Sequence, residues 1–398
     1  MSLVARLSTV SKRIVGGALS QLPDSVTGRL LPGHYRFRVN DIPPAPVFAS
    51  TSPSLLIAPT NFAGQGFQWA AAVRDRGAAQ ALSLAVAKPG DYAHAVDVRV
   101  PVGVYAASTS WSRDLRRAVA NEVSHVLVEA GRRPLGSVLT ESLDDQVRWM
   151  LDRGIVVGYL AHGSDLRLPS RHVEREPDSP FRHGLAREFS RWEWLVRDNL
   201  ALIARHGLPT LVSTPDLLLD IPSAHWLPVV IDPQAWRSDS PVLERPVPRV
   251  VHAPSRGVVK GSELVDAAMA PLVEEGLIEY QRVAGVPHRE MPEVYRDADV
   301  VLDQFRIGDY GVAACEAMAA GRLVISRVSA NARDAVAAQV PGGLPVVEAS
   351  ARDLESTMRA VLDDRDSYRL MAARGPDFVS ALHDGVRSAT VIERFLAT

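Results

Sequence analysis

Two basic residues stand out in a segment that reads H-A-P-S-R-G-V-V-K-G-S. Arg256 and Lys260 follow a short apolar run, Arg249–His252, and precede a helical pattern that Ser262 is expected to cap. Only three of the 44 basic residues are lysines, so Lys260 indicates a place where a compact charge matters. Cations before a helix start predict a diphosphate site, with a solvated loop cation as the alternative.

A second segment reads D-Q-F-R-I-G-D-Y-G and runs into an apolar helical pattern. Gly308, Asp309, Tyr310 and Gly311 lie at this strand-to-helix turn, where backbone N–H groups can bind an anion. Glu316 lies within the apolar helix, and a buried carboxylate requires a polar partner. The hydroxyls of a nucleotide ribose would supply it; a capping or interdomain salt-bridge role is the alternative.

Two further segments follow predicted strands in the first half of the chain. His162, Asp165 and Arg167 directly follow one strand and predict a polar rim, with structural hydrogen bonding by His162 as the alternative. The turn Gly64-Gln65-Gly66 follows another strand and precedes a helix, so its backbone could approach an anion. Its spacing is not G-x-G-x-x-G, and a turn that needs glycine for geometry alone is the other interpretation.

Short β-branched runs alternate with helical patterns along the chain, which is typical of α/β proteins with parallel sheets. Residues 231–248 hold four prolines and predict a domain boundary near residue 240. All four polar segments then lie at carboxyl ends of strands, where such sheets bind ligands. The predicted strands cover residues 55–58, 82–87, 125–129, 155–160, 210–213, 249–252, 278–282, 300–303, 323–326 and 345–347.

The expected organisation therefore has four parts. Residues 1–50 form an N-terminal extension, 51–240 a first Rossmann-like domain and 241–376 a second, doubly wound one. The last apolar pattern, Phe378–Phe395, predicts one closing helix within 377–398 that packs across the domain junction.

Composition excludes several classes of function. With 44 basic and 46 acidic residues the net charge is −2, which disfavours nucleic acid as a partner. One cysteine, Cys315, excludes a disulfide framework and a cysteine-rich metal site, and a reducing cytoplasmic setting fits. The longest uncharged stretch, Ile42–Val73, contains five prolines and cannot be a membrane helix. A basic N-terminus, with Lys12 and its neighbours Arg6 and Arg13, leaves open a peripheral contact with the inner face of the membrane.

Taken together, H-A-P-S-x(4)-K-G-S, D-Q-F-x(2)-G-x-Y-G-x(4)-E-A-M-A-x-G and H-G-S-D resemble the retaining GT-B glycosyltransferases of the family 4-like group. The resemblance covers the chain from about residue 55 onward. It implies two facing Rossmann-like domains and a C-terminal helix that crosses back to the first. The implied activity, as in polysaccharide biosynthesis, transfers a sugar with retention from a UDP- or GDP-linked donor to a glycan, lipid-linked or small-molecule acceptor. It implies neither a metal nor another cofactor.

The resemblance also implies roles for the residues above. Arg256 and Lys260 would bind the donor diphosphate, Glu316 the ribose hydroxyls, and His162 the donor sugar near the reacting carbon. The Gly308–Gly311 loop would belong to the donor site. The Gly64–Gly66 turn would face the phosphates or the acceptor, and Asp165 and Arg167 would lie on the acceptor side.

One departure concerns the E-x(7)-E pattern of that family, because its first glutamate is replaced by Gly308. Backbone N–H groups of residues 309–311, or the Asp309 carboxylate, are the expected substitutes. Two alternatives stay open: a nucleotide-sugar-binding pseudoenzyme or assembly partner, and an epimerase with additional acid and base residues. Asp297-Ala298-Asp299 resembles a metal–diphosphate motif but precedes a strand, and Trp192 is expected to pack in a core or junction.

Overall fold

The computed structural model describes residues 22–49, 53–88, 90, 94–138 and 141–398. Contacts divide the chain into two compact units. The first comprises residues 1–161, 202–210 and 392–398, and the second comprises 162–201 and 211–391. The expected N-terminal basic residues Arg6, Lys12 and Arg13 lie outside the described residues.

The first sheet has seven strands in the order β3-β2-β1-β4-β5-β6-β7. Every strand pairing that we assign in it is parallel, as the alternation of strands and helices predicts. Its central strands are buried along their length, which explains their continuous apolar sequences. The strands are β1 (Ser54–Ala58), β2 (Gln80–Ala87), β3 (Val98–Pro101), β4 (His125–Glu129), β5 (Val156–Ala161), β6 (Thr210–Val212) and β7 (His225–Trp226).

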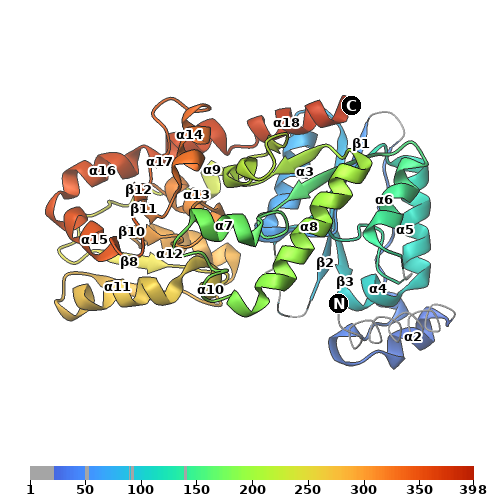
Figure 1. Cartoon of the computed structure of the whole chain (residues 1–398), viewed down its shortest axis with the longest axis horizontal. Helices are drawn as coiled ribbons and strands as arrows, with labels where there is room; N and C mark the ends of the chain where they lie inside the picture. The colour runs from blue at the N-terminus through green and yellow to red at the C-terminus, as the bar shows by residue number, and fades with distance from the viewer. Residues whose placement is uncertain (1–21, 50–52, 89, 91–93, 139–140) are drawn as a thin grey trace. The chain divides into compact units, whose positions relative to one another are not determined.

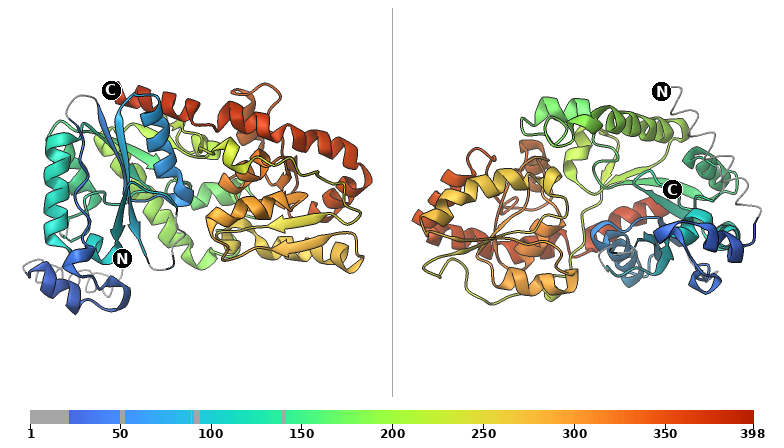
Figure 2. Two further views of the ribbon diagram at one scale, coloured as in Figure 1. Left: turned by 180° about the vertical axis from the view of Figure 1, so that it is seen from behind. Right: turned by 90° about the horizontal axis from the view of Figure 1, so that it is seen from below.

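Helices cover both faces of this sheet. Helix α3 (Gln65–Asp75) lies on one face, and α5 (Thr109–Glu122) and α6 (Leu143–Leu151) lie on the other (Figure 1). The rear view shows the same division (Figure 2). Two strands escaped prediction: β3, which begins with exposed and half-buried residues, and β7, which has only two residues.

Part of the N-terminal extension packs on the first unit. Helix α2 (Asp24–Leu30) places Asp24 against α5, where its carboxylate accepts hydrogen bonds from Ser108 Oγ (2.7 Å) and the Thr109 N–H (3.0 Å). Asp24 therefore helps to cap α5. Gly103, in α4 (Val102–Ala107), lets the extension approach closely, since a Cβ there would lie 2.1 Å from the Tyr35 carbonyl oxygen.

The second sheet has five strands in the order β12-β11-β10-β8-β9, all parallel. This doubly wound order reverses direction between β8 and β10, and ligands bind such sheets at this switch point. The prediction of five alternating strands in the second half is confirmed. The strands are β8 (Arg249–His252), β9 (Glu279–Arg282), β10 (Val300–Leu302), β11 (Leu323–Ser326) and β12 (Val347–Glu348).

Alternate residues of these strands enter two separate cores. Val251, Val301 and Val324 belong to one core, whereas Val250 and Val300 belong to the other. The two-residue period of a strand thus directs neighbouring side chains to opposite faces, each covered by helices. The helices that contribute to these cores are α9 (Pro233–Trp236), α11 (Ser262–Glu274), α12 (Met291–Arg296), α13 (Val312–Ala319), α14 (Ala330–Ala337), α15 (Leu354–Asp363), α16 (Arg365–Ala373) and α17 (Gly375–Leu382).

Two predicted helix boundaries were wrong. The closing helix is two helices, α17 and α18 (Val386–Leu396), because the chain turns at Gly385 with φ +99°. Ser262 is the first residue of α11 rather than its cap: its hydroxyl bonds to His252 Nε2 (2.9 Å), and Gly261, with φ +77°, separates α11 from the short helix α10 (Gly257–Lys260).

Helix α17 lies in the second unit, whereas α18 has residues in both units. Helix α17 packs on α13 so closely that a Cβ on Gly375 would lie 2.5 Å from the Met318 carbonyl oxygen. Residues 392–398 belong to the first unit, where Phe395 lies against Gly158 and edge-on to His125 at 5.4 Å. The predicted return of the C-terminal helix to the first unit is confirmed. None of the helices in the described ranges is both long and apolar enough to cross a bilayer.

Candidate functional site

The switch point of the second sheet brings two of the predicted segments together. The loop after β8 leads into α10, which ends at Lys260, and the loop after β10 begins at Asp303. Lys260 Nζ forms an ion pair with Asp303 Oδ1, and Asp303 Oδ2 accepts a hydrogen bond from the Gly311 N–H (3.0 Å). A buried carboxylate thus fixes a lysine ammonium beside the start of α13.

Arg306, in the loop after β10, binds helix α10 and the start of α11. Its guanidinium donates to the Val258 carbonyl (3.0 Å) and pairs with Glu263 (2.5 Å), and its side chain is only 4% exposed. The neighbouring Phe305 N–H donates to the Lys260 carbonyl (3.0 Å). Lys260 is therefore held at both its backbone and its side chain. Arg256, the residue before α10, is exposed.

A cavity of about 210 Å³ opens at this point within the second unit. Both predicted cations line it, together with polar groups from the loop after β10 and a group of apolar side chains. The lining residues are His162, Ser164, Arg167, Pro180, Phe181, Leu185, Trp192, Thr214, Ser255, Arg256, Val259, Lys260, Asp303, Gln304, Ile307, Asp309, Tyr310 and Gly311.

The loop from residue 304 to 311 is held in shape by its own amide side chain. Gln304 Oε1 accepts a hydrogen bond from the Ile307 N–H (2.7 Å), and Gln304 Nε2 donates to the carbonyls of Asp309 and Arg327. Gly308, with φ +81°, pairs with Val328 in an isolated parallel bridge. The loop is therefore preorganised against β11.

His172 ties this loop to helix α7 (Pro169–Arg175). Its Nε2 lies 3.0 Å from the Ile307 carbonyl oxygen, so Nε2 carries the proton, and Nδ1 accepts from Ser179 Oγ (2.7 Å). Burial, helped by the positive charge of Arg167, lowers the pKa of His172 to about 4. The imidazole is neutral at pH 7 and holds the loop by hydrogen bonding alone.

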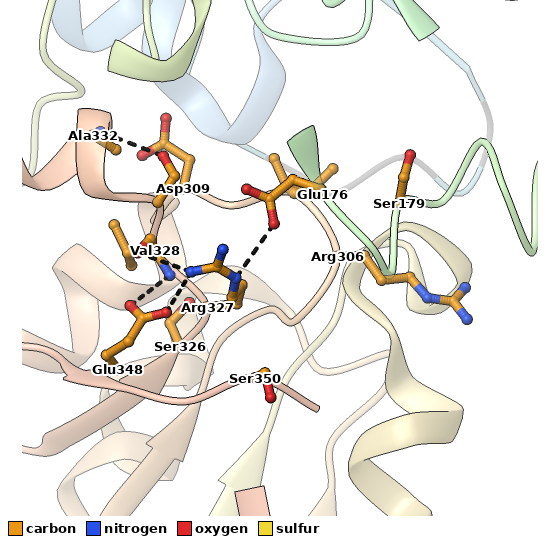
Figure 3. A network of polar contacts seen from close by, with 12 residues as sticks. Glu176, Ser179, Arg306, Asp309, Ser326, Arg327, Val328, Ala332, Glu348 and Ser350 are labelled. Carbon is orange, nitrogen blue, oxygen red and sulfur yellow. Dashed lines mark hydrogen bonds and ion pairs between the residues drawn. The ribbon is translucent and has the colours of Figure 1, made fainter. Parts of the chain in front are cut away.

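Glu176 occupies the space beside Gly308. A Cβ on Gly308 would lie 2.5 Å from Glu176 Oε1 and 2.8 Å from its Cδ. Figure 3 shows Glu176 pointing toward Arg327, whose Nε lies 3.3 Å from the Glu176 carboxylate and whose Nη1 donates to Glu348 (2.7 Å). Burial raises the pKa of Glu176, although Arg327 opposes the shift. A side chain at position 308 would have to displace this carboxylate.

Asp309 and Arg167, which both line the cavity, belong to a buried polar network. Asp309 accepts hydrogen bonds from the N–H groups of Tyr310 (2.7 Å) and Asp216 (3.1 Å), while Arg167 Nε donates to Asp216 (2.7 Å). Against the effect of burial, Arg167 lowers the pKa of Asp216 to about 2. Burial and the charge of Asp216 raise the pKa of Asp309. One cation beside two carboxylates thus accompanies pKa shifts in opposite directions for Asp216 and Asp309.

Glu316 has a protein partner in this structure. Its Oε1 lies 2.8 Å from His288 Nε2, and the His288 ring stands edge-on to Trp236 at 5.5 Å. The hydrogen bond that His288 donates to Glu316 raises the pKa of His288, although burial opposes the shift, and burial raises the pKa of Glu316 itself. Glu316 lies on α13, beyond the residues that line the cavity.

The first-half candidates fall in two places. His162 lines the cavity, and its backbone N–H donates to Asp165 Oδ1 (3.0 Å), which stabilises the turn after β5. The Gly64–Gly66 turn lies in the first unit, at the start of α3. There the Thr60 N–H donates to the buried Glu129 (2.9 Å), and Asn61 Oδ1 accepts from the Phe67 N–H (3.1 Å).

Acidic residues elsewhere have structural partners. Asp299 is buried and accepts from the N–H groups of Leu243 (2.7 Å) and Arg249 (2.9 Å), and Asp297 pairs with Arg245 (2.8 Å). These contacts connect the residues just before β10 to the start of β8 and to residues 243–245. The D-x-D pattern therefore has a structural role. Within the described ranges, no group of three or more histidine, cysteine, aspartate or glutamate residues is placed to hold a metal ion.

Sequence reasoning missed the residues contributed by 172–216. His172, Glu176 and Asp216 each contact the 304–311 loop, yet more than 90 residues separate them from it in the chain. Trp192, which was expected to pack in a core or junction, is half-buried and lines the cavity. The available signal was weak, because the apolar residues Pro180, Phe181, Leu185 and Trp192 are spaced among charged and polar ones.

Part of the second unit is similar to a known protein family. Residues 274–378 match the family model described as "Glycosyl transferases group 1". This part contains the loop after β10 and Glu316, while Lys260 precedes it. The match to this family model lies within the second unit. A search of curated proteins finds no match.

Solved structures resemble the chain over most of its length. Sucrose-phosphate synthase from Thermosynechococcus elongatus has a TM-score of 0.57 at 15% identity, covering 87% of this chain and 98% of that one. Anabaena HepE, in complex with UDP and glucose, has a TM-score of 0.56 at 12% identity, covering 87% of this chain and 100% of that one. A glycosyltransferase from Rickettsia africae has a TM-score of 0.51 at 10% identity, covering 87% and 99%. The predicted GT-B fold is confirmed.

Proposed function

We propose that the protein is a glycosyltransferase that moves a sugar from a nucleotide-diphosphate sugar to a glycan, lipid-linked or small-molecule acceptor. The observation that carries this proposal is the Lys260–Asp303 pair at the switch point of the group 1 domain, beside the start of α13. A fixed cation and a helix start together form a site for an anionic leaving group.

The diphosphate is assigned to Lys260 and Arg256. Asp303 orients the Lys260 ammonium, so binding a phosphate does not require the side chain to be ordered first. Helix α13 has no side chain that caps its first amides, and its positive end faces the same anion. These charges and the helix start offset part of the charge of the diphosphate, and the proposed reaction uses no metal.

The nucleoside is assigned to the region of Glu316. A carboxylate can accept hydrogen bonds from two neighbouring ribose hydroxyls, and His288 already holds one of its oxygens. Because the ribose adjoins the diphosphate, a site on α13 two turns or less from Gly311 is within the reach of a nucleotide. UDP and GDP are both candidates, and UDP is the first to test because it is bound to HepE in that structure.

Sugar transfer would then proceed with retention of configuration. The bond between the anomeric carbon and the diphosphate oxygen breaks, and the acceptor oxygen bonds to that carbon on the same face. The acceptor proton moves to the leaving diphosphate, which Lys260 and Arg256 stabilise. His162, which lines the cavity, is placed against the transferred sugar, while Asp165 and Arg167 shape the acceptor side.

Nucleotide release tests the proposal directly. Full-length protein is incubated with UDP- and GDP-sugars, with a panel of sugar acceptors, and in the presence or absence of EDTA. Release of UDP or GDP that requires an acceptor and survives EDTA supports metal-independent transfer, and NMR of the product reports its anomeric configuration. Inversion would contradict retention, and acceptor-independent conversion of the donor would indicate an epimerase.

A nucleotide-sugar-binding protein without turnover is the second candidate. It is favoured by Gly308, because this position lacks the first glutamate of E-x(7)-E and the Glu176 carboxylate fills the adjoining space. Calorimetry with UDP-glucose distinguishes the two candidates. Binding without nucleotide release across the acceptor panel would support this candidate over the enzyme.

A further inference from the structure

We propose that the acceptor carries an apolar group, aromatic or alkyl, which binds against a wall formed by Pro180, Phe181, Leu185 and Trp192. We call these four residues the apolar wall. The inference rests on the proposed function, because it names the class of acceptor for the same cavity. Its basis is the chemistry of the lining between residues 180 and 192.

Every residue that this segment contributes to the cavity is apolar. Val259 and Ile307, from α10 and the loop after β10, extend the apolar lining. Phe181 is buried, whereas Leu185 and Trp192 are half-buried and thus keep surface available for a ligand. The wall therefore offers area for burying a hydrophobic group, and its one polar side-chain group is the indole N–H of Trp192.

The apolar wall is built into the second unit rather than loosely placed over it. Phe181 stands edge-on to His172 at 5.8 Å, and the Leu185 N–H donates to the Pro180 carbonyl (2.7 Å). Gly184 is packed so closely on α10 that a Cβ there would lie 2.3 Å from Val258 Cγ1. A preorganised surface of this kind loses little entropy when a ligand binds to it.

The donor does not account for this wall. Its phosphates and sugar hydroxyls need polar partners, and placing them on apolar side chains would leave hydrogen bonds unmade. Its base has flat faces that can stack on apolar side chains, but the base lies beyond the ribose. The ribose candidate Glu316 is not among the cavity residues, so the base would lie away from the apolar wall.

The remaining occupant is the acceptor. Its reactive hydroxyl must approach the donor sugar, and polar side chains of His162, Ser164 and Thr214 line the same cavity. An acceptor with a hydroxyl on one side and an aromatic or alkyl group on the other matches both halves of this lining. A fully polar glycan would match only one of them.

The test compares two soluble acceptors that differ only in this group: p-nitrophenyl β-D-glucoside and methyl β-D-glucoside. Each is titrated into the full chain saturated with UDP, and calorimetry gives the two affinities. We expect the aryl glucoside to bind at least roughly tenfold more tightly, because burying an aromatic ring contributes about that factor or more. Equal affinities in the wild-type protein would overturn the proposal.

The α8 helix (Phe189–His206) offers a matched pair of variants. Trp192→Ala should abolish most of the aryl advantage, whereas Trp194→Ala, at a side chain that is 60% exposed, should preserve it. Leu185→Asn, which keeps the side-chain size, repeats the test if Trp192→Ala unfolds. Loss of UDP affinity in Trp192→Ala with an intact aryl advantage would assign the wall to the nucleotide and overturn the proposal.

The result for the apolar acceptor group can be distinguished from the result for the proposed glycosyltransferase activity. If wild-type protein neither binds nor consumes any UDP- or GDP-sugar, the glycosyltransferase proposal fails whatever the glucosides do. If donors are consumed but aryl and methyl glucosides react with the same kcat/KM, only the apolar acceptor is excluded. Donor consumption together with a Trp192-dependent preference for the aryl glucoside supports both.

Discussion

The two sheets each have a switch point, and a buried carboxylate stands at both. In the first sheet the order reverses between β1 and β4, where Glu129 ends β4. In the second it reverses between β8 and β10, and Asp303 directly follows β10. Each site also has a glycine-containing turn before a helix, Gly64–Gly66 and Gly308–Gly311.

The difference lies in what each carboxylate binds. Glu129 accepts the backbone N–H of Thr60, and Asn61 occupies the N–H of Phe67 at the start of α3. Asp303 also accepts a backbone N–H, that of Gly311 (3.0 Å), and in addition pairs with the Lys260 ammonium next to an open cavity. Both turns therefore present a carboxylate and an occupied amide, and the second adds a fixed cation.

Glycine at a strand-to-helix turn is thus an incomplete signal for an anion site. Both turns have the glycines that allow a close backbone approach, and the sequence predicts phosphate contacts for both. The partners of the carboxylates and amides separate them. For Gly64, Gln65 and Gly66 the geometry favours the acceptor over the phosphates, and this role remains a prediction.

The largest expected effect is at Lys260. Lys260→Ala should lower kcat/KM roughly 100-fold and weaken UDP binding, because removing one preorganised partner of a developing charge costs about that much. Calorimetry with UDP and nucleotide-release kinetics measure both effects. Arg289→Ala, at a side chain that is 77% exposed, should have neither effect.

A double variant separates lost binding from lost folding. Lys260→Ala also leaves Asp303 buried without its cation, which costs about 3–5 kcal/mol. Lys260→Met with Asp303→Asn removes both charges and should recover stability in urea unfolding. UDP binding should stay weak in that protein, and full recovery of binding would refute the assignment of the diphosphate to Lys260.

The next largest effect is expected on stability, from a substitution of Gly308 in the second turn. Gly308→Ala should destabilise the fold by about 1–3 kcal/mol, because its φ of +81° disfavours alanine and a Cβ would meet Glu176 at 2.5 Å. Gly276→Ala is the matched control, since Gly276 has φ +70° and no atom near its Cβ position. Urea unfolding gives both changes, and their difference measures the contact with Glu176.

A second substitution tests whether the contact with Glu176 causes the loss of stability in Gly308→Ala. Gly308→Ala in a Glu176→Ala background removes the clash but keeps the backbone strain. The cost of Gly308→Ala should then fall to that of Gly276→Ala. An unchanged cost would mean that the backbone conformation alone requires glycine at position 308.

Most of the fold follows from the sequence because its strands are buried and apolar. The runs at β1, β4, β8 and β11 predict their strands to within a residue, since continuous β-branched and leucine residues mark buried parallel strands. Pattern reasoning failed where that signal is absent. Strand β3 begins with polar and half-buried positions, and a single glycine at 385 divides the predicted closing helix.

The candidate site divides in a similar way. Lys260 and the Gly308–Gly311 loop were identified because local spacing places them beside strands and helix starts. His172, Glu176 and Asp216 were not, because their importance depends on contacts across more than 90 residues of chain. The partner of Glu316 was also missed, since nothing in the local pattern of His288 indicates that its ring reaches α13.

A smaller effect is expected at the first switch point. Asn61→Ala frees the Phe67 N–H and should destabilise the protein by about 1 kcal/mol, the usual cost of losing a side-chain bond at a helix start. UDP affinity should change by less than roughly twofold, because Glu129 remains beside the freed amide and repels an anion. Calorimetry and urea unfolding measure the two quantities. A large loss of UDP affinity would show that this turn contacts the nucleotide after all.

The smallest effect is a pH dependence at the second switch point. The Glu316 carboxylate raises the pKa of His288, so the pair stabilises the fold fully below the unfolded pKa of about 6.5 and less as pH rises through the higher folded value. The stability difference between wild type and Glu316→Gln should therefore shrink between about pH 6 and pH 9. Its size should stay below about 1 kcal/mol, because the His288 side chain is 38% exposed and solvent screens the pair. Urea unfolding across this range measures the difference. A pH-independent difference would mean that His288 holds Glu316 by a neutral hydrogen bond alone, and a ribose could then share the carboxylate without competing against a charge.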